Sequence, residues 1–167
     1  MRQISEKPGL LPLFLPSAGF ATHVQIMRAY LDRIADAFAG VVDAKSPWTY
    51  RHSDRTCVIA MSMAVLLGCD EQVVTDMRRA ALLHDIGKLA ISNRILDKPG
   101  KLTDDEFAKV RAQPAYTLQI LRRAPCFAAI APLAANHHER IDGTGYPIGL
   151  RGDALDLPMR ALAVADV

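Results

Sequence analysis

The sequence predicts an all-α fold of five to seven helices, and three observations indicate it. Apolar residues recur every three or four positions along most of the chain, as they do on one face of an amphipathic helix. No segment alternates apolar and polar residues in the manner of a half-buried strand. Half of the 167 residues are apolar and 23% are charged, a composition typical of globular domains and not of disordered chains. We therefore expect one compact helical bundle.

The first predicted helix runs from about Thr22 to Val42 and ends before Pro47, because the residue preceding a proline avoids the helical region. Its apolar residues share one face: Met27, Tyr30, Leu31, Ile34, Phe38, Val41 and Val42. That face either packs on its own domain, pairs with a second chain in a homodimer, or connects to an upstream sensor domain. Residues 1–21 are expected to be extended, since the apolar run 10–16 contains two prolines and is shorter than the roughly 20 residues that span a bilayer.

Two further helices have clear end signals. A second helix is expected from Ser53 to Leu67, with Gly68 closing it as a C-cap. Asp70 is a suitable N-cap for a third helix, which begins near Glu71 and runs to His84.

A Thr-x-x-Glu pattern at Thr103 and Glu106 predicts a capping box at the start of the next helix. Pro114 either interrupts this helix near its end or opens a following helix over 115–123. The pattern then predicts a helix over 128–139, a loop rich in glycine and proline over 141–158, and a last helix over 159–167.

Charge and cysteine usage exclude some classes of partner. The formal net charge of +2 is too small to indicate a nucleic-acid surface, and no segment is suited to span a membrane. Cys57, Cys69 and Cys126 are odd in number and widely spaced, which is typical of reduced thiols in a cytoplasmic protein.

Histidine is scarce, yet four of the five histidines lie near acids or one another, which indicates a metal site. An apolar run leads directly into His84-Asp85, and a buried Asp85 requires a partner that a metal ion would provide. The two carboxylate oxygens of Asp85 could bridge two ions. If the helix continues, Lys88 lies on the same face, where it either binds a substrate phosphate or forms an ordinary salt bridge with Asp85.

Two motifs resemble a known family. The run HDIGK at 84–88 resembles the core of the HD phosphohydrolases, and HHERIDGTGYP at 137–147 is similar to the HHExxDGxGYP signature of their HD-GYP subgroup. The resemblance covers about 31–167, including residues 50–53, the turn at 98–100 and the final Ala-Asp-Val. It implies an HD-domain helical bundle in a bacterial cytoplasmic signalling enzyme, which hydrolyses cyclic di-GMP to pGpG or GMP.

The resemblance also implies roles for individual residues. By position, the metal ligands would be His52, His84, Asp85, His137, His138 and Asp166. Asp85 and Lys88 would be catalytic, and the substrate would contact Lys88, Arg140, Gly143, Gly145, Tyr146 and Pro147. Two divalent ions, iron or manganese foremost, would clamp the phosphodiester and activate a water for in-line attack.

Two positions depart from the family pattern. Gln113 stands where the family has a histidine that binds the second metal, and an amide oxygen is a poor replacement, so we expect a weakened second ion or only one. Trp48 replaces a glutamate that supports a third metal in some members, so a trinuclear centre is not expected. An alternative function is therefore a degenerate domain that binds a nucleotide or a protein.

We expect an N-terminal helical unit over 22–47 and an HD-GYP-like domain over 48–167, cut short at its C-terminus.

Overall fold

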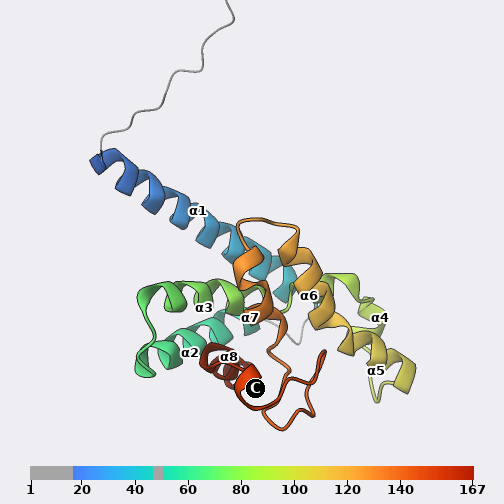
Figure 1. The fold of residues 1–167 in the computed structure, drawn as a ribbon. Coiled ribbons are helices and arrows are strands. Elements are labelled where there is room, and N and C mark those ends of the chain that lie inside the picture. Colours follow the sequence, from blue (N-terminus) through green and yellow to red (C-terminus); the bar gives the residue numbers. More distant parts are fainter. Residues whose placement is uncertain (1–16, 47–50) are drawn as a thin grey trace, which may run out of the picture.

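The computed structural model describes residues 17–46 and 51–167, and this part of the chain is helical with connecting loops and no β-strand. Six α-helices have eight residues or more: α1 (Ser17–Asp43), α2 (His52–Leu66), α3 (Glu71–Leu83), α5 (Asp104–Arg111), α6 (Gln113–Arg122) and α8 (Leu157–Ala165). The shorter elements are α4 (Asn93–Leu96), α7 (Ala131–Ala135) and the 3-10 helices η2 (Ile86–Ala90), η3 (Ala128–Ile130) and η4 (Gly152–Ala154). The predicted all-α fold is confirmed (Figure 1).

The core lies where α2, α3 and α8 pack together (Figure 1). Ala60 and Ala64 of α2 and Ala80 of α3 are fully buried, and their small side chains let the helices approach closely. Leu162 of α8 is also fully buried in this cluster. Helix α6 packs on η2 and α7. This packing brings four helix ends together: the C-terminal ends of α3, α7 and α8 and the N-terminal end of α2.

The contacts of helix α1 with the body begin at Arg28, whose backbone carbonyl accepts a hydrogen bond from Arg79 of α3 at 3.3 Å, and continue to its C-terminal end. Ala35, Ala39 and Val42 are buried there, and Asp32 forms an ion pair with Arg79 of α3 at 2.7 Å. The N-terminal half projects away from the other helices (Figure 1). None of the described helices is both long enough and apolar enough to cross a membrane.

The predicted caps are confirmed. The Asp70 carboxylate accepts a hydrogen bond from the amide of Val73 at 2.8 Å, which satisfies one of the free donors at the start of α3. The Thr103 hydroxyl accepts from the Glu106 amide and the Glu106 carboxylate accepts from the Thr103 amide, so the capping box before α5 is complete. Gly68 has a φ of 74°, the left-handed conformation that ends α2.

One helix boundary at the N-terminal side of the chain differs from the sequence prediction. Helix α1 begins at Ser17 instead of Thr22, so residues 17–21 are helical and not extended. A single glycine in this stretch, Gly19, costs only about 1 kcal/mol relative to alanine and does not end the helix. The rest of the expected extended segment, residues 1–16, and positions 47–50, which include Trp48, lie outside the described residues.

The two internal prolines open helices instead of interrupting them. Helix α5 ends at Arg111 and Pro114 lies in the first turn of α6, which confirms the second of the two alternatives. The single helix predicted over 128–139 was wrong in its extent, because η3 precedes α7 and α7 ends at Ala135. Pro132 lacks an amide hydrogen and its ring would clash with the carbonyl of Ala128, so an α-helix cannot continue through it from Ala128.

Candidate metal centre

The histidines and aspartates singled out in the sequence lie at the ends of four helices. His52 is the first residue of α2, and His84 and Asp85 directly follow α3. His137 comes two residues after α7, and Asp166 directly follows α8. Since these four ends meet, residues far apart in the sequence become neighbours.

In the described part of the chain, two overlapping groups of side chains could each hold a metal ion. One is His52, His84 and Asp85, and the other is His84, His137 and Asp166; within each group the ligand atoms lie within 4.8 Å of one another. Asp166 Oδ1 is 2.9 Å from His52 Nε2 and 3.0 Å from His84 Nε2. Five of the six predicted ligands are therefore clustered. The sixth, His138, has its Nδ1 3.8 Å from Asp166 Oδ2.

Backbone carbonyls fix the orientation of two of the imidazoles. His84 donates its Nδ1 hydrogen to the Ala81 carbonyl at 2.6 Å, and His137 donates its own to the Ala134 carbonyl at 2.7 Å. When these rings are neutral, each leaves the Nε2 lone pair available, the arrangement found in metal-binding histidines. His137 Nε2 is buried and has no hydrogen-bond partner in the structure. A buried acceptor of this kind fits a cation, so the donor set suits a divalent metal.

The centre carries strongly perturbed proton affinities. Burial disfavours the charged form of His84, but the carboxylates of Asp85 and Asp166 outweigh it and raise the pKa of His84 to about 10. Burial also disfavours the charged forms of both carboxylates, yet the neighbouring histidines hold the pKa of Asp85 and that of Asp166 well below the usual range. Burial, reinforced by the charge of His84, lowers the pKa of His137 to about 3. Without a metal, the site thus holds a protonated His84 against two carboxylates.

Asp85 also forms an ion pair with Lys88, with Nζ 2.5 Å from Oδ2. The α-helix does not continue to Lys88, because α3 ends at Leu83 and Lys88 lies on the 3-10 helix η2. The salt bridge that the sequence offered as an alternative is present. A contact between Lys88 and a substrate phosphate stays a prediction.

Gln113 lies beside this turn and is 2% exposed. Its amide nitrogen donates to the His84 backbone carbonyl at 2.9 Å and to the Thr117 hydroxyl oxygen at 3.0 Å. Since a backbone carbonyl only accepts, these bonds fix which end of the amide is the nitrogen. The carbonyl oxygen of Gln113 is buried and has no hydrogen-bond partner. The side chain thus braces the His84 backbone, a contact that the sequence pattern did not indicate.

The N-terminal half of α6 packs directly against the turn formed by residues His84–Lys88. The Gly87 amide donates to the Thr117 hydroxyl at 3.0 Å, and that hydroxyl donates to the His84 carbonyl at 2.8 Å. A Cβ at Gly87 would lie 2.1 Å from the Gln113 backbone oxygen, so only glycine fits this contact. The close packing of α6 therefore explains why the HDIGK run has a glycine at position 87.

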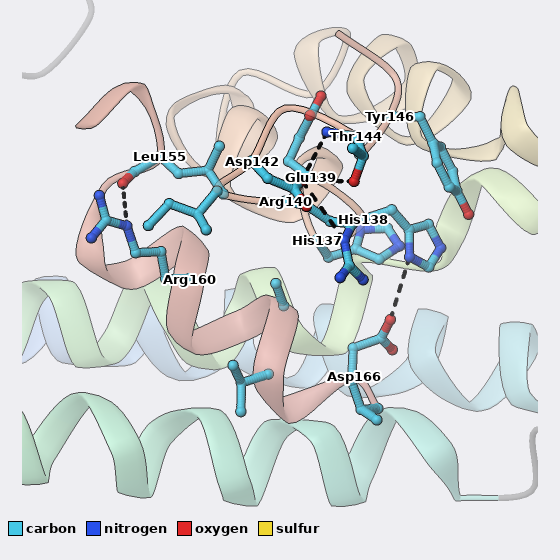
Figure 2. Close-up of a pocket in the computed structure, with 15 residues that line it drawn as sticks. His137, His138, Glu139, Arg140, Asp142, Thr144, Tyr146, Leu155, Arg160 and Asp166 are labelled. Atoms are coloured by element: carbon cyan, nitrogen blue, oxygen red, sulfur yellow. Dashed lines mark hydrogen bonds and ion pairs between the residues drawn. The ribbon is translucent and has the colours of Figure 1, made fainter. Parts of the chain in front are cut away.

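A cleft of about 860 Å³ opens beside the candidate metal centre. Figure 2 shows His137, His138 and Asp166 pointing toward one another at one side of it, with Tyr146 next to His138. Of the predicted substrate-binding residues, Arg140, Gly145 and Tyr146 line the cleft. Gly143 and Pro147 belong to the same loop but do not form its wall, and neither does Lys88.

Glu139 organises the loop that borders the cleft, a role the sequence did not reveal. Its buried carboxylate accepts hydrogen bonds from the backbone amides of Ile148, Gly149 and Leu150 at 2.6–3.1 Å. Nearby, the Asp142 carboxylate accepts from the amide and hydroxyl of Thr144. The only signal for Glu139 was its place in the motif beside two histidines, since its partners are backbone groups without a sequence pattern.

Tyr146 lies between two other side chains. Its ring is 4.7 Å from the ring of His138, and the guanidinium of Arg111 lies 4.9 Å from its centroid on the α5 side. Burial raises the pKa of Tyr146, with Arg111 opposing the shift. These two contacts hold the Tyr146 ring at the wall of the cleft, next to His138.

Comparisons with known proteins agree with this geometry. Residues 36–167 match the family model described as HD domain, and the chain belongs to this family. The chain is 48% identical, over 87% of its length, to the 3'3'-cGAMP-specific phosphodiesterase 3 of Vibrio cholerae, covering 32% of that protein. It is 43% identical over 72% of its length to a cyclic di-GMP phosphodiesterase of Pseudomonas aeruginosa, covering 29% of it.

A third relative is a cyclic di-GMP phosphodiesterase response regulator of Xanthomonas campestris, 39% identical over 84% of this chain and 36% of the relative. The chain thus spans about a third of the length of the curated relatives it matches. The resemblance inferred from the two motifs is confirmed, and the relatives named here act on cyclic dinucleotides.

Proposed function

We propose that this chain is the phosphodiesterase domain of an enzyme that hydrolyses cyclic di-GMP to pGpG or GMP. The observation that carries the proposal is the convergence of His52, His84, Asp85, His137 and Asp166 beside a cleft large enough for a nucleotide. The relatives support hydrolysis of a cyclic dinucleotide. Because one of them is named as specific for 3'3'-cGAMP, this ligand is the second substrate to test.

The resident cofactor we propose is divalent iron or manganese, held by the five clustered residues together with His138. When bound, such an ion neutralises charge on a phosphodiester and lowers the pKa of a coordinated water. The backbone braces at Ala81 and Ala134 keep two Nε2 atoms directed into the site. The amide nitrogen of Gln113 donates a hydrogen bond to the backbone carbonyl of His84, so we propose that the second ion binds weakly or not at all.

In this proposal, residues in and near the cleft recognise the substrate. Lys88 supplies a positive charge beside Asp85, outside the cleft wall, and Arg140 supplies one at the wall, where its side chain is 70% exposed. Both would bind phosphate oxygens. The ring of Tyr146, fixed between His138 and Arg111, offers an aromatic edge to a base.

The test is to incubate the chain with Mn²⁺ or Fe²⁺ and either cyclic di-GMP or 3'3'-cGAMP, and to follow the products by chromatography. We expect hydrolysis that D85A abolishes and that D105A, a substitution of an exposed acid on α5, leaves unchanged. A chain that holds two ions yet hydrolyses neither dinucleotide contradicts the proposal.

One observation favours the alternative of a degenerate binding module. The Gln113 amide is committed to the His84 backbone and offers at most an oxygen to a metal. In that case the chain would bind a cyclic dinucleotide with one ion or none and release no product. Equilibrium binding measured beside the hydrolysis assay separates the two functions.

We also propose that α1 is the attachment point for a partner, either a second copy of the chain or an upstream sensor domain. Met27, Tyr30, Ile34 and Val41 are 41–56% exposed on the side of α1 that faces away from the body. Met27, Ile34 and Val41 are spaced by seven residues, the repeat of a helix-pairing seam. The three cysteines are free and Cys57 is buried, which supports the proposed cytoplasmic location.

A further inference from the structure

Helix α2 begins without a cap of its own. Its N-cap residue, Arg51, has φ 53° and ψ 24° and makes no side-chain capping hydrogen bond. Within the described part of the chain, Arg51 is the one non-glycine residue with a positive φ. Such a conformation is strained for arginine and persists only where the surroundings hold it in place. The strained residue immediately precedes His52, which belongs to the candidate metal centre.

The missing cap is supplied by another helix. Asp43, the last residue of α1, accepts a hydrogen bond from the Ser53 hydroxyl at 2.7 Å and from the Ser53 amide at 3.3 Å. Ser53 is the second residue of α2, and its amide is one that an N-cap side chain normally accepts from. A carboxylate at this end also complements the positive end of the helix dipole. Ser53 is fully buried, so the contact is shielded from solvent.

The position of His52 depends on the Asp43–Ser53 contact more than the positions of His84 and His137 do. His84 and His137 are each oriented by a carbonyl on their own helix. His52 Nε2 instead lies in the centre, 2.9 Å from Asp166 Oδ1 and 3.3 Å from His84 Nε2. Its backbone, which lies between Arg51 and Ser53, therefore sets where the ring is.

We propose that Asp43 is a positioning residue that fixes the start of α2 and thereby places His52 in the metal centre. The inference rests on the proposed role of His52 as a metal ligand. Asp43 belongs to α1, so the contact joins the last residue of α1 to the start of α2.

The experiment compares metal binding by the wild-type chain, D43A and D43N, using Mn²⁺ titration calorimetry and the absorption spectrum of bound Co²⁺. We expect D43A to weaken Mn²⁺ binding by about tenfold or more, as losses around metal ligands do. The Co²⁺ spectrum should indicate one fewer nitrogen ligand. D43N keeps an oxygen acceptor and should restore most of the affinity.

Two controls separate positioning from a general loosening of α1. D36A removes the Asp36–Arg78 ion pair between α1 and α3 but leaves the contact of Arg78 with Asp32, and it should leave Mn²⁺ binding unchanged. In a chain that already carries H52A, D43A should cause no further loss, because its effect passes through His52. If D43A fails to fold, S53A removes the hydroxyl donor alone and should weaken binding in the same direction.

The outcomes distinguish the inference from the proposed function. A folded D43A chain that binds Mn²⁺ as tightly as wild type overturns the positioning role alone, as does an equal loss in the H52A background. A wild-type chain that binds neither Mn²⁺ nor Fe²⁺ nor Co²⁺ overturns both.

Discussion

Gln113 is the residue most relevant to whether the centre is active, because it stands at an expected metal-ligand position. The residue is buried, its amide nitrogen is bonded to the His84 carbonyl, and its oxygen has no hydrogen-bond partner. An imidazole at this position would present a nitrogen, which divalent iron binds better than an amide oxygen. We therefore expect the residue at this position to influence whether the centre binds one ion or two.

We expect Gln113→His to raise the amount of metal bound per chain and the rate of cyclic di-GMP hydrolysis, each by severalfold, because it adds an imidazole nitrogen. Metal content is measured after dialysis, and the rate is measured with saturating Mn²⁺. Gln119→His, which adds an imidazole at an exposed position of the same helix, is the matched control. If Gln113→His changes neither quantity, the weakened-site interpretation is wrong.

His84 gives the centre a defined pH dependence. In the metal-free chain its pKa is raised from 6.5 to about 10, so its contribution to stability is complete below pH 6.5 and is lost as the pH rises through about 10. A metal must displace that proton, and we expect Mn²⁺ affinity to increase with pH below about 10, with about one proton released per ion. Calorimetry in two buffers of different ionisation enthalpy measures the release. No proton release at neutral pH would contradict the prediction.

At the scale of residues, the sequence predicted which residues form the candidate metal centre better than it predicted which contacts hold them in place. The scarce histidines and Asp85 could be selected because few residue types bind metals. The brace from Gln113 to the His84 backbone and the anchoring of Ile148–Leu150 by Glu139 could not be predicted, because their partners are backbone groups whose positions depend on the tertiary fold.

Among the elements, α1 has two different faces. One face packs on the domain through Ala35, Ala39 and Val42, and the other exposes Met27, Ile34 and Val41. A helix half that projects without tertiary packing is marginally stable in water, which favours a second helix against the exposed face.

We expect Ile34→Lys to abolish self-association through α1, because it places a charge at the centre of the exposed seam. Light scattering coupled to size exclusion measures the mass across a concentration series. Val58→Lys, on the exposed face of α2, introduces the same charge elsewhere and should leave the mass unchanged. A wild-type chain that stays monomeric at high concentration points to the sensor domain as the partner.

The capping box of α5 is a local source of stability. Thr103→Ala removes the hydroxyl that accepts from the Glu106 amide and should lower the free energy of unfolding by about 1 kcal/mol. Urea denaturation of the metal-free chain measures the change. Thr103→Ser keeps the hydroxyl and should lose little of that stability.

Local signals explain which elements could be predicted. Asp70, Gly68 and the Thr103 box act on neighbouring residues, so their effects were visible in the sequence. The division of 128–139 into η3 and α7 was missed because the apolar pattern continues through Pro132. The pattern marks the buried face and does not show that the helix type changes along it.

At the scale of the whole molecule, the candidate metal centre brings together residues that are far apart in the sequence. His52 and Asp166 are 114 residues apart in the sequence and 2.9 Å apart in the structure. Their meeting depends on the packing of α8 against α2, which no local pattern encodes. The motif resemblance supplied the assignment of Asp166, and periodicity alone would have left it unremarked.

Metal binding should therefore stabilise the entire domain. At a concentration one hundred times the dissociation constant, Mn²⁺ should add about 2.7 kcal/mol to the free energy of unfolding and raise Tm by several degrees. It should also slow hydrogen exchange in α8. Asp166→Ala should remove both effects, whereas Asp153→Ala, which changes a fully exposed acid, should retain them. Equal Tm values with and without Mn²⁺ would contradict a metal centre here.

The proximity of His52 to Asp166 has a topological consequence. An ion held by both closes most of the chain into a ring, in the way that a disulfide does. A protease cut in the loop between Tyr146 and Asp156 would leave the C-terminal piece tied to the rest of the chain through the ion. The ion would then act as a reversible cross-link that adds to the packing of α8 on α2 and α3.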